Sequence, residues 1–519
     1  MRIIDKQLKL GIAAINAVGK LKTKRAKNIK FSPFGIGLEK ADGGYYDPSV
    51  VYRYINELGV KWVRIQSGWA RCEKQCGVYD FSWLDEIIDN ILRQGAKPWI
   101  CLCYGNPIYD VRAPENSRAC GYPPIISADM ICAWKKYVES VVVRYRGKVN
   151  HYEIWNEPDG THCWKSGVNG KEYGEFVSIT SAIIRNVDKD CRIIAGSMCN
   201  TIRLKDFCED TGVVFDEDVA IKNFFTDWLS VVSADAIDFV SVHLYRVDPE
   251  GKANKYFAYL RSELSKLNPK IGIIQGETGT HAGFSRIGAL NSFEWTQRKQ
   301  AKFLLRRMYT DFVHDVYLSS YFSLLDMYEN LNNENVFLTK ENFGLYGVLA
   351  AEFDERGIFT GSYRKKQSFF ALQALNTAFS DGVKKIKNEF EFVTLRNSYW
   401  GGSDVSDHDP LASFLVGNSF EGASGKRFEV FYMATSILNI EYEGTVSVVL
   451  DRVLEQPAFV DLISGKVFPI LADNVSREGM RTTIFRLPLK DYPCLLIDLK
   501  DTDLSVKVYK SYKTDRENK

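Results

Sequence analysis

From residue 30 to residue 380 the sequence alternates between short apolar runs and longer amphipathic segments, and this rhythm restricts the possible folds more than any other feature. Runs such as Lys97 to Tyr104 are apolar almost throughout, which is typical of parallel strands buried on both faces. Capping residues delimit the helices between them, for example Gly59 at a C-terminus and Ser127 at an N-terminus. Strands are expected at residues 34–39, 61–66, 97–104, 149–157, 192–197, 236–244, 270–277 and 316–325. This succession of strand–helix units predicts an α/β fold, the (β/α)8 or TIM barrel.

The helical period ends near residue 381, and the rest of the chain has a different pattern. Short alternating or β-branched runs separated by Gly, Asn and Ser turns predict an all-β sandwich after the barrel. A chain of 519 residues is long enough for both domains. We therefore expect a lead segment at 1–29 that packs on the sandwich, a catalytic barrel at 30–380, a sandwich domain at 381–512 and a frayed tail at 513–519.

The composition argues against several classes of partner. The apolar fraction of 45% and the charged fraction of 25% are those of a globular protein with a large core. A net charge of +2 provides no electrostatic footprint for nucleic acid or for an anionic membrane. No run of about 20 apolar residues is present, so no membrane span is expected. The sequence does not exclude a homo-oligomer, because an apolar edge of the sandwich can pair subunits.

The cysteines and histidines give no sign of a metal or another cofactor. The eleven cysteines are scattered, and the close pairs 72/76 and 101/103 have no second pair at zinc-site spacing. The six histidines are dispersed as well. Buried, reduced thiols are therefore expected, which indicates a reducing compartment. The mildly apolar stretch 8–18 resembles a signal peptide, but Asp5, Gln7 and Asn16 interrupt it, so a cytoplasmic location is expected.

Two glutamates end predicted barrel strands. The fourth strand runs into Asn156-Glu157-Pro158, and since proline cannot donate to a sheet ladder, the strand is expected to stop at Glu157. Glu277 ends the seventh strand. Barrels of this type hold their catalytic residues at the C-terminal ends of the strands, and strands four and seven lie across the mouth from each other. Either glutamate alone would be explained as well by a helix cap or a surface salt bridge, but the two together favour a facing pair.

A facing pair of carboxyl groups about 5–5.5 Å apart is the requirement of a retaining glycosidase, with one nucleophile and one acid that later acts as base. Two like charges at ~5.5 Å repel by about 3 kcal/mol at an effective dielectric of ~20, or roughly 2 pK units. One group is therefore expected to stay protonated near neutrality while the other is ionised.

The stretch from His151 to Gly160 resembles the acid/base strand of clan A glycoside hydrolases, whose signature is Asn-Glu at the end of the fourth strand. Within that clan, Glu153-Ile154-Trp155-Asn156-Glu157-Pro158, the run 77–85 and Phe343-Gly344-Leu345 are similar to family 39. That family pairs the barrel with a β-sandwich, acts with retention, and includes β-xylosidases and α-L-iduronidases. Gly276-Glu277-Thr278-Gly279 is closer to family 5.

The resemblance implies roles for several residues and requires no cofactor. It makes Glu157 the acid/base and Glu277 the nucleophile. It implies that Asn156 binds the sugar 2-hydroxyl and that Arg64 hydrogen-bonds the nucleophile, although a structural salt bridge to Glu153 would explain Arg64 nearly as well. Glu153 shares strand parity with Glu157 and is expected to point inward as a structural residue.

Further candidates for sugar contact come from strand ends and neighbouring aromatic residues, and each of them has a core packing role as its alternative. Tyr245 is expected near the nucleophile, with His243 on the same face of the sixth strand. The eighth strand lacks the Trp of many relatives, so the sequence does not identify which aromatic residue forms the floor of the sugar site. The remaining candidates are Trp69, Tyr104, Asn106, Trp155, Trp164, His281, Asp326 and Tyr328.

Long insertions at 105–126, 198–220 and 326–364 are expected to wall off a pocket, which favours exo-action on a terminal sugar. The expected function is a retaining O-glycoside hydrolase for a terminal β-linked sugar of the xyloside, galactoside or glucoside type. The alternatives are a uronidase, an endo-glycanase, a transglycosidase and a non-catalytic carbohydrate-binding barrel.

Overall fold

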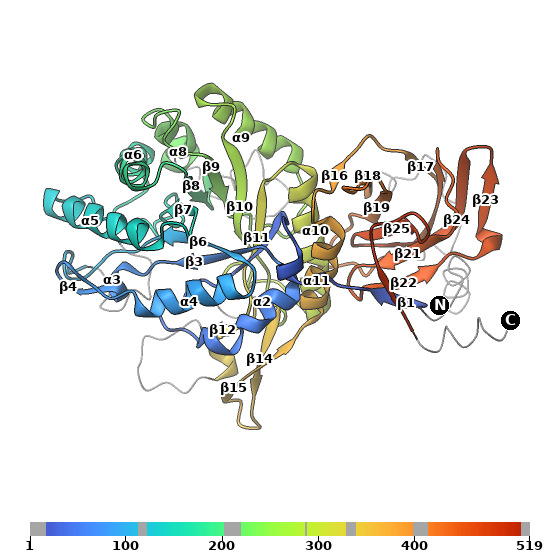
Figure 1. The fold of residues 1–519 in the computed structure, drawn as a ribbon, viewed down its shortest axis with the longest axis horizontal. Coiled ribbons are helices and arrows are strands. Elements are labelled where there is room, and N and C mark those ends of the chain that lie inside the picture. The colour runs from blue at the N-terminus through green and yellow to red at the C-terminus, as the bar shows by residue number, and fades with distance from the viewer. Residues whose placement is uncertain are drawn as a thin grey trace.

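The computed structural model describes residues 17–112, 122–201, 219–285, 288–328, 339–397 and 414–509. A barrel with surrounding helices lies beside a separate group of antiparallel sheets, the β domain, which is drawn in orange and red in Figure 1.

The barrel is closed by parallel strands in the order β10-β11-β2-β3-β6-β7-β8-β9, which confirms the predicted fold. In chain order these strands are β2 (Phe34–Gly37), β3 (Trp62–Gln66), β6 (Lys97–Leu102), β7 (His151–Ile154), β8 (Arg192–Met198), β9 (Phe239–Val242), β10 (Gly272–Thr278) and β11 (Leu318–Tyr321). The helices that follow them are α2 (Tyr52–Leu58), α4 (Ser82–Arg93), α5 (Ala128–Tyr145), α6 (Gly170–Val187), α8 (Val219–Leu229), α9 (Ala253–Leu267), α10 (Gln297–Val313) and α11 (Gln367–Phe379).

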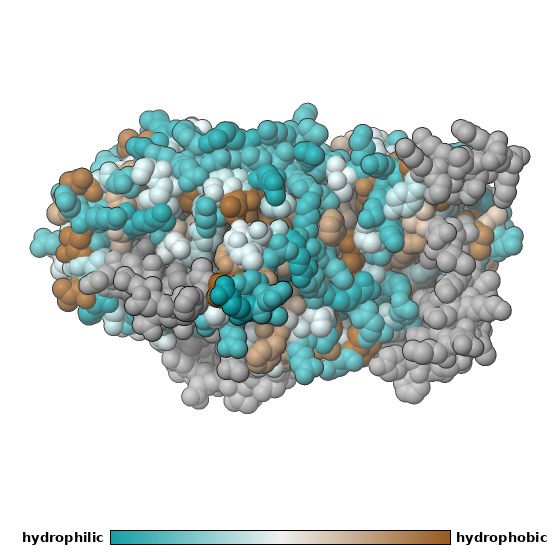
Figure 2. Space-filling view, turned by 90° about the horizontal axis from the view of Figure 1, so that it is seen from below, coloured by the Kyte–Doolittle hydropathy of each residue, from teal (hydrophilic) through white to brown (hydrophobic). Residues whose placement is uncertain are grey.

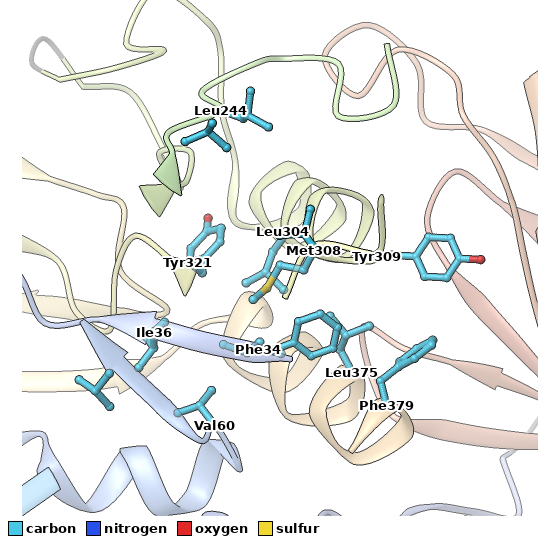
Figure 3. Packing of buried hydrophobic residues seen from close by; sticks show 14 of the residues in the cluster. Phe34, Ile36, Val60, Leu244, Leu304, Met308, Tyr309, Tyr321, Leu375 and Phe379 are labelled. Atoms are coloured by element: carbon cyan, nitrogen blue, oxygen red, sulfur yellow. The ribbon is translucent and has the colours of Figure 1, made fainter. Parts of the chain in front are cut away.

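The caps that mark helix ends in the sequence are present. The Ser127 hydroxyl accepts a hydrogen bond from the Met130 amide at 3.2 Å, and Gly59 ends α2 with a φ of 79°. The helices pack their apolar faces against the barrel strands. Figure 3 shows this contact where Phe34 of β2 meets α10 and α11, with its ring 6.3 Å from that of Phe379.

The fourth barrel strand ends earlier than predicted. Strand β7 stops at Ile154, three residues before Glu157, because Trp155 and Glu157 have positive φ values of 68° and 45°. Residues other than glycine rarely adopt this left-handed backbone, and it breaks the alternation of an extended strand. The turn, rather than Pro158, therefore ends the strand and sets the direction of Glu157.

The β domain contains an antiparallel sheet in the order β16-β18-β19-β25-β21-β22-β1-β26 and a second sheet in the order β17-β20-β24-β23, and β19 contacts β24 between them. Strand β1 (Gly19–Leu21), from the beginning of the described chain, pairs with β22 and β26. The other strands are β16 (Lys384–Lys385), β17 (Phe390–Asn397), β18 (Leu415–Glu421), β19 (Arg427–Met433), β20 (Glu443–Leu450), β21 (Pro457–Asp461), β22 (Lys466–Pro469), β23 (Val475–Glu478), β24 (Arg481–Lys490), β25 (Cys494–Asp498) and β26 (Val506–Val508).

Short hairpins extend the barrel loops. They are β4 (Glu73–Gln75) with β5 (Val78–Tyr79), β12 (Met327–Tyr328) with β13 (Phe343–Gly344), and β14 (Leu349–Phe353) with β15 (Phe359–Lys365). In the described part of the chain no helix is long and apolar enough to cross a membrane. Among the nine cysteines within the described ranges, Cys72, Cys76, Cys101, Cys103, Cys132, Cys191 and Cys494 are free thiols. The face in Figure 2 is mainly hydrophilic where it is coloured, with hydrophobic residues in small separate groups.

Helix α10 joins the barrel to the β domain through buried charges. The Lys302 ammonium donates to Asp491 at 2.7 Å and to Glu441 at 2.6 Å. One turn further on, the Arg306 guanidinium donates to Glu250 of the barrel and to the Thr435 carbonyl of the β domain. Since Lys302 and Asp491 are almost completely buried, each requires the other to offset its desolvation.

We predict that Lys302→Ala lowers stability by about 3–5 kcal/mol, because it leaves the Asp491 carboxylate buried without its cation. The control is Lys148→Ala, which breaks the half-exposed pair with Asp89 and is expected to cost less than ~1 kcal/mol. Thermal unfolding of both variants against the wild type checks this. Equal decreases in the two midpoints would contradict the role of Lys302.

Candidate active site

A pocket of about 310 Å³ opens at the C-terminal ends of the barrel strands. It is lined by Glu39, Lys40, Gln66, Tyr104, Asn156, Glu157, His162, Cys163, Cys199, Asn200, Tyr245, Glu277, Gly288, Ala289, Phe322 and Tyr346. The lining therefore combines three carboxyl groups with aromatic rings and neutral polar groups, a mixture that suits a polar ligand with apolar faces.

Glu157 and Glu277 face each other across this pocket. A carboxylate oxygen of one lies within 4.8 Å of a carboxylate oxygen of the other, and each side chain is 13% exposed. Glu277 belongs to β10, and Glu157 lies in the turn after β7. The spacing is near that of a retaining pair and leaves too little room for the water that an inverting pair holds between its carboxyl groups.

Arg64 of β3 fixes one of these carboxylates from below. Its Nη1 donates to Glu277 Oε2 at 2.9 Å, its Nε donates to Glu153 Oε2 at 2.7 Å, and its Nη2 donates to Asn156 Oδ1 at 2.8 Å. The Tyr245 hydroxyl donates to the other Glu277 oxygen at 2.6 Å. Burial, together with the charge of Glu277, raises the pKa of Tyr245 well above its usual value, so this hydroxyl keeps its proton. Both donors stabilise negative charge on Glu277.

Glu157 lies between two histidines. His162 Nε2 is 2.5 Å from Glu157 Oε2, and His243 Nδ1 is 2.9 Å from Glu157 Oε1. Burial raises the pKa of Glu157, but the hydrogen bonds from the two imidazoles outweigh it, and the pKa lies below its usual value. This corrects the expectation that the Glu157 carboxyl itself keeps a proton near neutrality. That expectation considered only repulsion by Glu277, and the contact with His162 was not predicted.

Glu39 contributes a third carboxyl group that the sequence analysis did not assign to the site. It follows β2, is almost completely buried, and accepts a hydrogen bond from Arg64 Nη1 at 3.3 Å. Burial raises the pKa of Glu39 to about 8, since the opposing effect of Arg64 is weaker and the charge of Glu277 adds to the increase. Glu39 and Gln66 each lie at a C-terminal strand end, the same signal that identified Glu157 and Glu277.

Five of the other predicted residues lie in or next to the pocket. Tyr104, Asn156 and Tyr245 line the pocket, whereas Arg64 and His243 lie beneath it and contact the carboxylates. Tyr104 accepts a hydrogen bond from the Gln66 amide at 2.8 Å.

The aromatic candidates Trp155 and Trp164 do not line the pocket. Both are completely buried, and their rings pack edge to face at 5.7 Å within a cluster that includes Phe176. Their apolar surface is used in the core between β7 and α6. This corrects the expectation that these two rings contact the sugar.

Asn106, His281 and Asp326 do not line this pocket and have structural contacts instead. The Asn106 amide donates to the Glu73 carbonyl at 2.8 Å, and His281 accepts from the Leu345 amide at 3.3 Å. Asp326 forms a buried ion pair with Lys366 at 2.6 Å. Each polar group is buried and uses its hydrogen bonds to hold a loop, which corrects the expectation that it contacts sugar.

Two groups of side chains among the described residues have the spacing to hold a metal ion: Glu157 with His162 and Cys163, and Glu157 with His243 and Glu277. Both include Glu157, so a cation bound at either place would occupy the carboxylate. The expected absence of a metal site stays a prediction.

A larger hollow of about 820 Å³ lies between the loops after β10 and β11, with Phe284, Asp326 and Lys366 among its lining residues. Its buried charges, Asp326 and Lys366, neutralise each other. We therefore place the candidate site at the smaller pocket, where carboxyl groups of the barrel strands converge.

Comparison with solved structures finds the same fold in glycoside hydrolases. A family 39 glycoside hydrolase from Bacteroides cellulosilyticus WH2 is 14% identical, with a TM-score of 0.58 over 90% of this chain and 80% of its own. A β-xylosidase of family 39 from Caulobacter crescentus is 15% identical, with a TM-score of 0.50 over 93% and 97%. A family 30 endoxylanase from Clostridium papyrosolvens is 12% identical, with a TM-score of 0.52 over 92% and 97%. At these identities the similarity concerns the fold.

The sequence itself supplies the family. The model of glycosyl hydrolases family 39 matches residues 9–268, half of the chain, including β7 and the turn that carries Glu157. The chain therefore belongs to glycosyl hydrolases family 39 and is a glycosidase of clan A.

Proposed function

We propose that the protein hydrolyses a terminal β-linked sugar with retention of configuration, with Glu277 as nucleophile and Glu157 as acid/base. The observation that supports this most is the separation of the two carboxyl groups, with oxygens within 4.8 Å. The unequal surroundings support the division of roles. Arg64 and Tyr245 donate to Glu277 and favour its charged form, which a nucleophile needs, whereas Glu157 contacts two imidazoles.

In the first step Glu277 attacks the anomeric carbon while Glu157 gives a proton to the leaving oxygen, and a covalent glycosyl ester forms. The pKa of Glu157 is below its usual value, so the proton for this step is shared with His162, whose Nε2 lies 2.5 Å away. In the second step Glu157 accepts a proton from water, which then attacks the ester. Asn156, held by Arg64, is positioned to bind the sugar 2-hydroxyl.

The pocket supports exo-action on one sugar unit. Its volume of about 310 Å³ is at the lower end of ligand pockets, which suits a single ring better than a chain of subsites. Parts of the long insertions that were expected to wall it off lie outside the described residues. A xyloside is the first substrate to test, since one solved structure of the same family is a β-xylosidase. The second candidate is endo-action, because a family 30 endoxylanase shares the fold.

A panel of 4-nitrophenyl β- and α-glycosides, including xyloside, galactoside, glucoside, arabinoside and glucuronide, tests the proposal. We expect turnover of β-glycosides with the β-anomer as first product in a proton NMR time course. An α-anomer as first product would contradict retention. Repeating the reaction with an added alcohol separates hydrolysis from transglycosylation.

Substitution of the two glutamates separates their roles. Glu277→Ala is expected to lower turnover of every substrate more than ~1,000-fold, because it removes the carboxylate that forms the ester. Glu157→Ala should lower turnover of unactivated glycosides by about 100- to 10,000-fold but spare the first step with 2,4-dinitrophenyl glycosides, whose leaving group needs no proton. Equal losses on both substrate classes in Glu157→Ala would exclude Glu157 as the acid.

The pH dependence tests the proton shared by His162 and Glu157. In the wild type the pair titrates as a unit and loses its proton as the pH rises through the range of an imidazole. His162→Ala removes a donor and raises the pKa of Glu157 from its depressed value, but the proton now rests on a carboxyl group alone, which loses it before an imidazole does. We therefore expect the basic limb of kcat/KM to move to lower pH.

Two controls accompany this measurement. Lys165→Ala removes a cation from the same loop without a contact to Glu157 and should leave the limb in place. With a 2,4-dinitrophenyl glycoside as substrate, the basic limb of the kcat/KM profile should be absent in the wild type and in both variants. An unchanged limb in His162→Ala would show that the histidine holds no part of the proton.

A further inference from the structure

The three carboxyl groups of the pocket come from well-separated points on the barrel rim. In the strand order β10-β11-β2-β3-β6-β7, Glu277 lies on β10, Glu39 follows β2 and Glu157 follows β7. The leaving group must lie on the side of Glu157, which protonates it in the proposed mechanism. The anomeric carbon must lie between Glu157 and Glu277, and Glu39 stands on the remaining side of the pocket, three strands from one and two from the other. It therefore faces the edge of the sugar ring where the 3- and 4-hydroxyls lie.

The backbone around Glu39 is shaped to hold its carboxyl group in this place. A Cβ atom on Gly37 would overlap the Glu39 carboxyl, so any larger residue at this position would displace the carboxyl group from its place. The Tyr46 hydroxyl contacts the carbonyl oxygens of Leu38 and Glu39 at 2.7 and 2.9 Å and fixes the chain directly after the end of β2.

Charge balance does not explain the presence of Glu39. Arg64 already donates to the carboxylates of Glu153 and Glu277 at 2.7 and 2.9 Å, and its contact with Glu39 Oε1 is longer, at 3.3 Å. Glu39 Oε2 is buried and has no hydrogen-bond partner among the described residues, although the side chain lines the pocket. A buried polar atom without a partner is costly, and a hydroxyl of a bound ligand would satisfy it.

The protonation of Glu39 suits a neutral sugar. Burial raises its pKa to about 8, so the carboxyl group is largely protonated at neutral pH. A protonated carboxyl group both donates and accepts, which matches a sugar hydroxyl or a pair of neighbouring hydroxyls. An anionic substituent at the same edge would lie beside the Glu277 carboxylate and be repelled by it.

We propose that Glu39 is a specificity-determining residue that hydrogen-bonds the 3- or 4-hydroxyl of the terminal sugar, and that the enzyme therefore takes neutral glycosides that carry this hydroxyl. This inference rests on the proposed function, because the orientation of the ring follows from the role of Glu157.

The test compares 4-nitrophenyl β-D-xylopyranoside with its 3-deoxy and 4-deoxy analogues. In the wild type, one analogue is expected to have a kcat/KM lower than the parent by roughly 10- to 100-fold. In Glu39→Ala the kcat/KM values of the parent and this analogue should differ by no more than about 3-fold, because the hydrogen-bond partner of the hydroxyl is gone. Glu39→Gln keeps a donor and an acceptor and should restore part of the difference in kcat/KM between the parent and the analogue. A uronide should be disfavoured by the wild type.

The matched control is Glu429→Gln in the β domain. Glu429 is also buried, is paired with Arg452, and has a pKa that burial raises to about 7, but it lies far from the pocket. This variant should keep the wild-type difference in kcat/KM between the parent and the analogue. Thermal unfolding of each variant verifies that it is folded. Equal losses on the parent and both analogues in Glu39→Ala, or no change at all, would overturn the proposal and assign Glu39 to the support of Arg64.

A binding measurement separates this proposal from the proposed function. Calorimetry with a xylose-configured isofagomine and its analogue lacking the corresponding hydroxyl requires no turnover. Glu39→Ala should weaken binding of the parent by roughly 10-fold or more and leave the analogue unchanged. Equal affinities of the parent for the wild type and Glu39→Ala overturn the Glu39 proposal even if Glu277→Ala abolishes hydrolysis. Conversely, turnover that persists in Glu277→Ala overturns the proposed function, while the binding result still tests Glu39.

Discussion

A buried guanidinium at the mouth of the barrel holds the proposed catalytic groups in one arrangement. Arg64 of β3 donates to Glu153 of β7, to Asn156 after β7 and to Glu277 of β10, so a single side chain connects strands from three parts of the rim. Burying these charges costs free energy that the ion pairs only partly offset. The cost is understandable at an active site, because the fork of the guanidinium fixes both direction and distance for each acceptor.

The sequence predicted the parts of this arrangement that depend on strand ends. The barrel, Glu157 and Glu277 follow from apolar runs that stop at a polar residue, and Glu153 follows from alternation along β7. The contact of His162 with Glu157 could not be found in this way. It depends on the left-handed turn at Trp155 and Glu157, which turns the chain back so that a residue five positions later reaches the carboxylate.

The course of the loops also explains why some polar residues were wrongly predicted to contact the sugar. Asn106, His281 and Asp326 follow strand ends, as Glu39 does, but the loops after these strands fold back and use the side chains for their own hydrogen bonds. The sequence shows that a polar residue follows a strand, but it does not show whether the loop uses that side chain for its own hydrogen bonds. In the β domain, β1 was harder still to predict as a strand, because its partners β22 and β26 lie more than 400 residues further along the chain.

The division of protons among the carboxyl groups follows from their neighbours. Repulsion alone requires that not all three be charged, but it does not decide which one is neutral. Glu277 accepts hydrogen bonds from Arg64 and Tyr245, which favours its charged form, while the contacts with two imidazoles lower the pKa of Glu157. Glu39 has one long contact to Arg64 and little solvent, so burial determines its state. The three carboxyl groups of the pocket thus differ in their surroundings, and each difference arises from the hydrogen bonds and the burial that the position of the group provides.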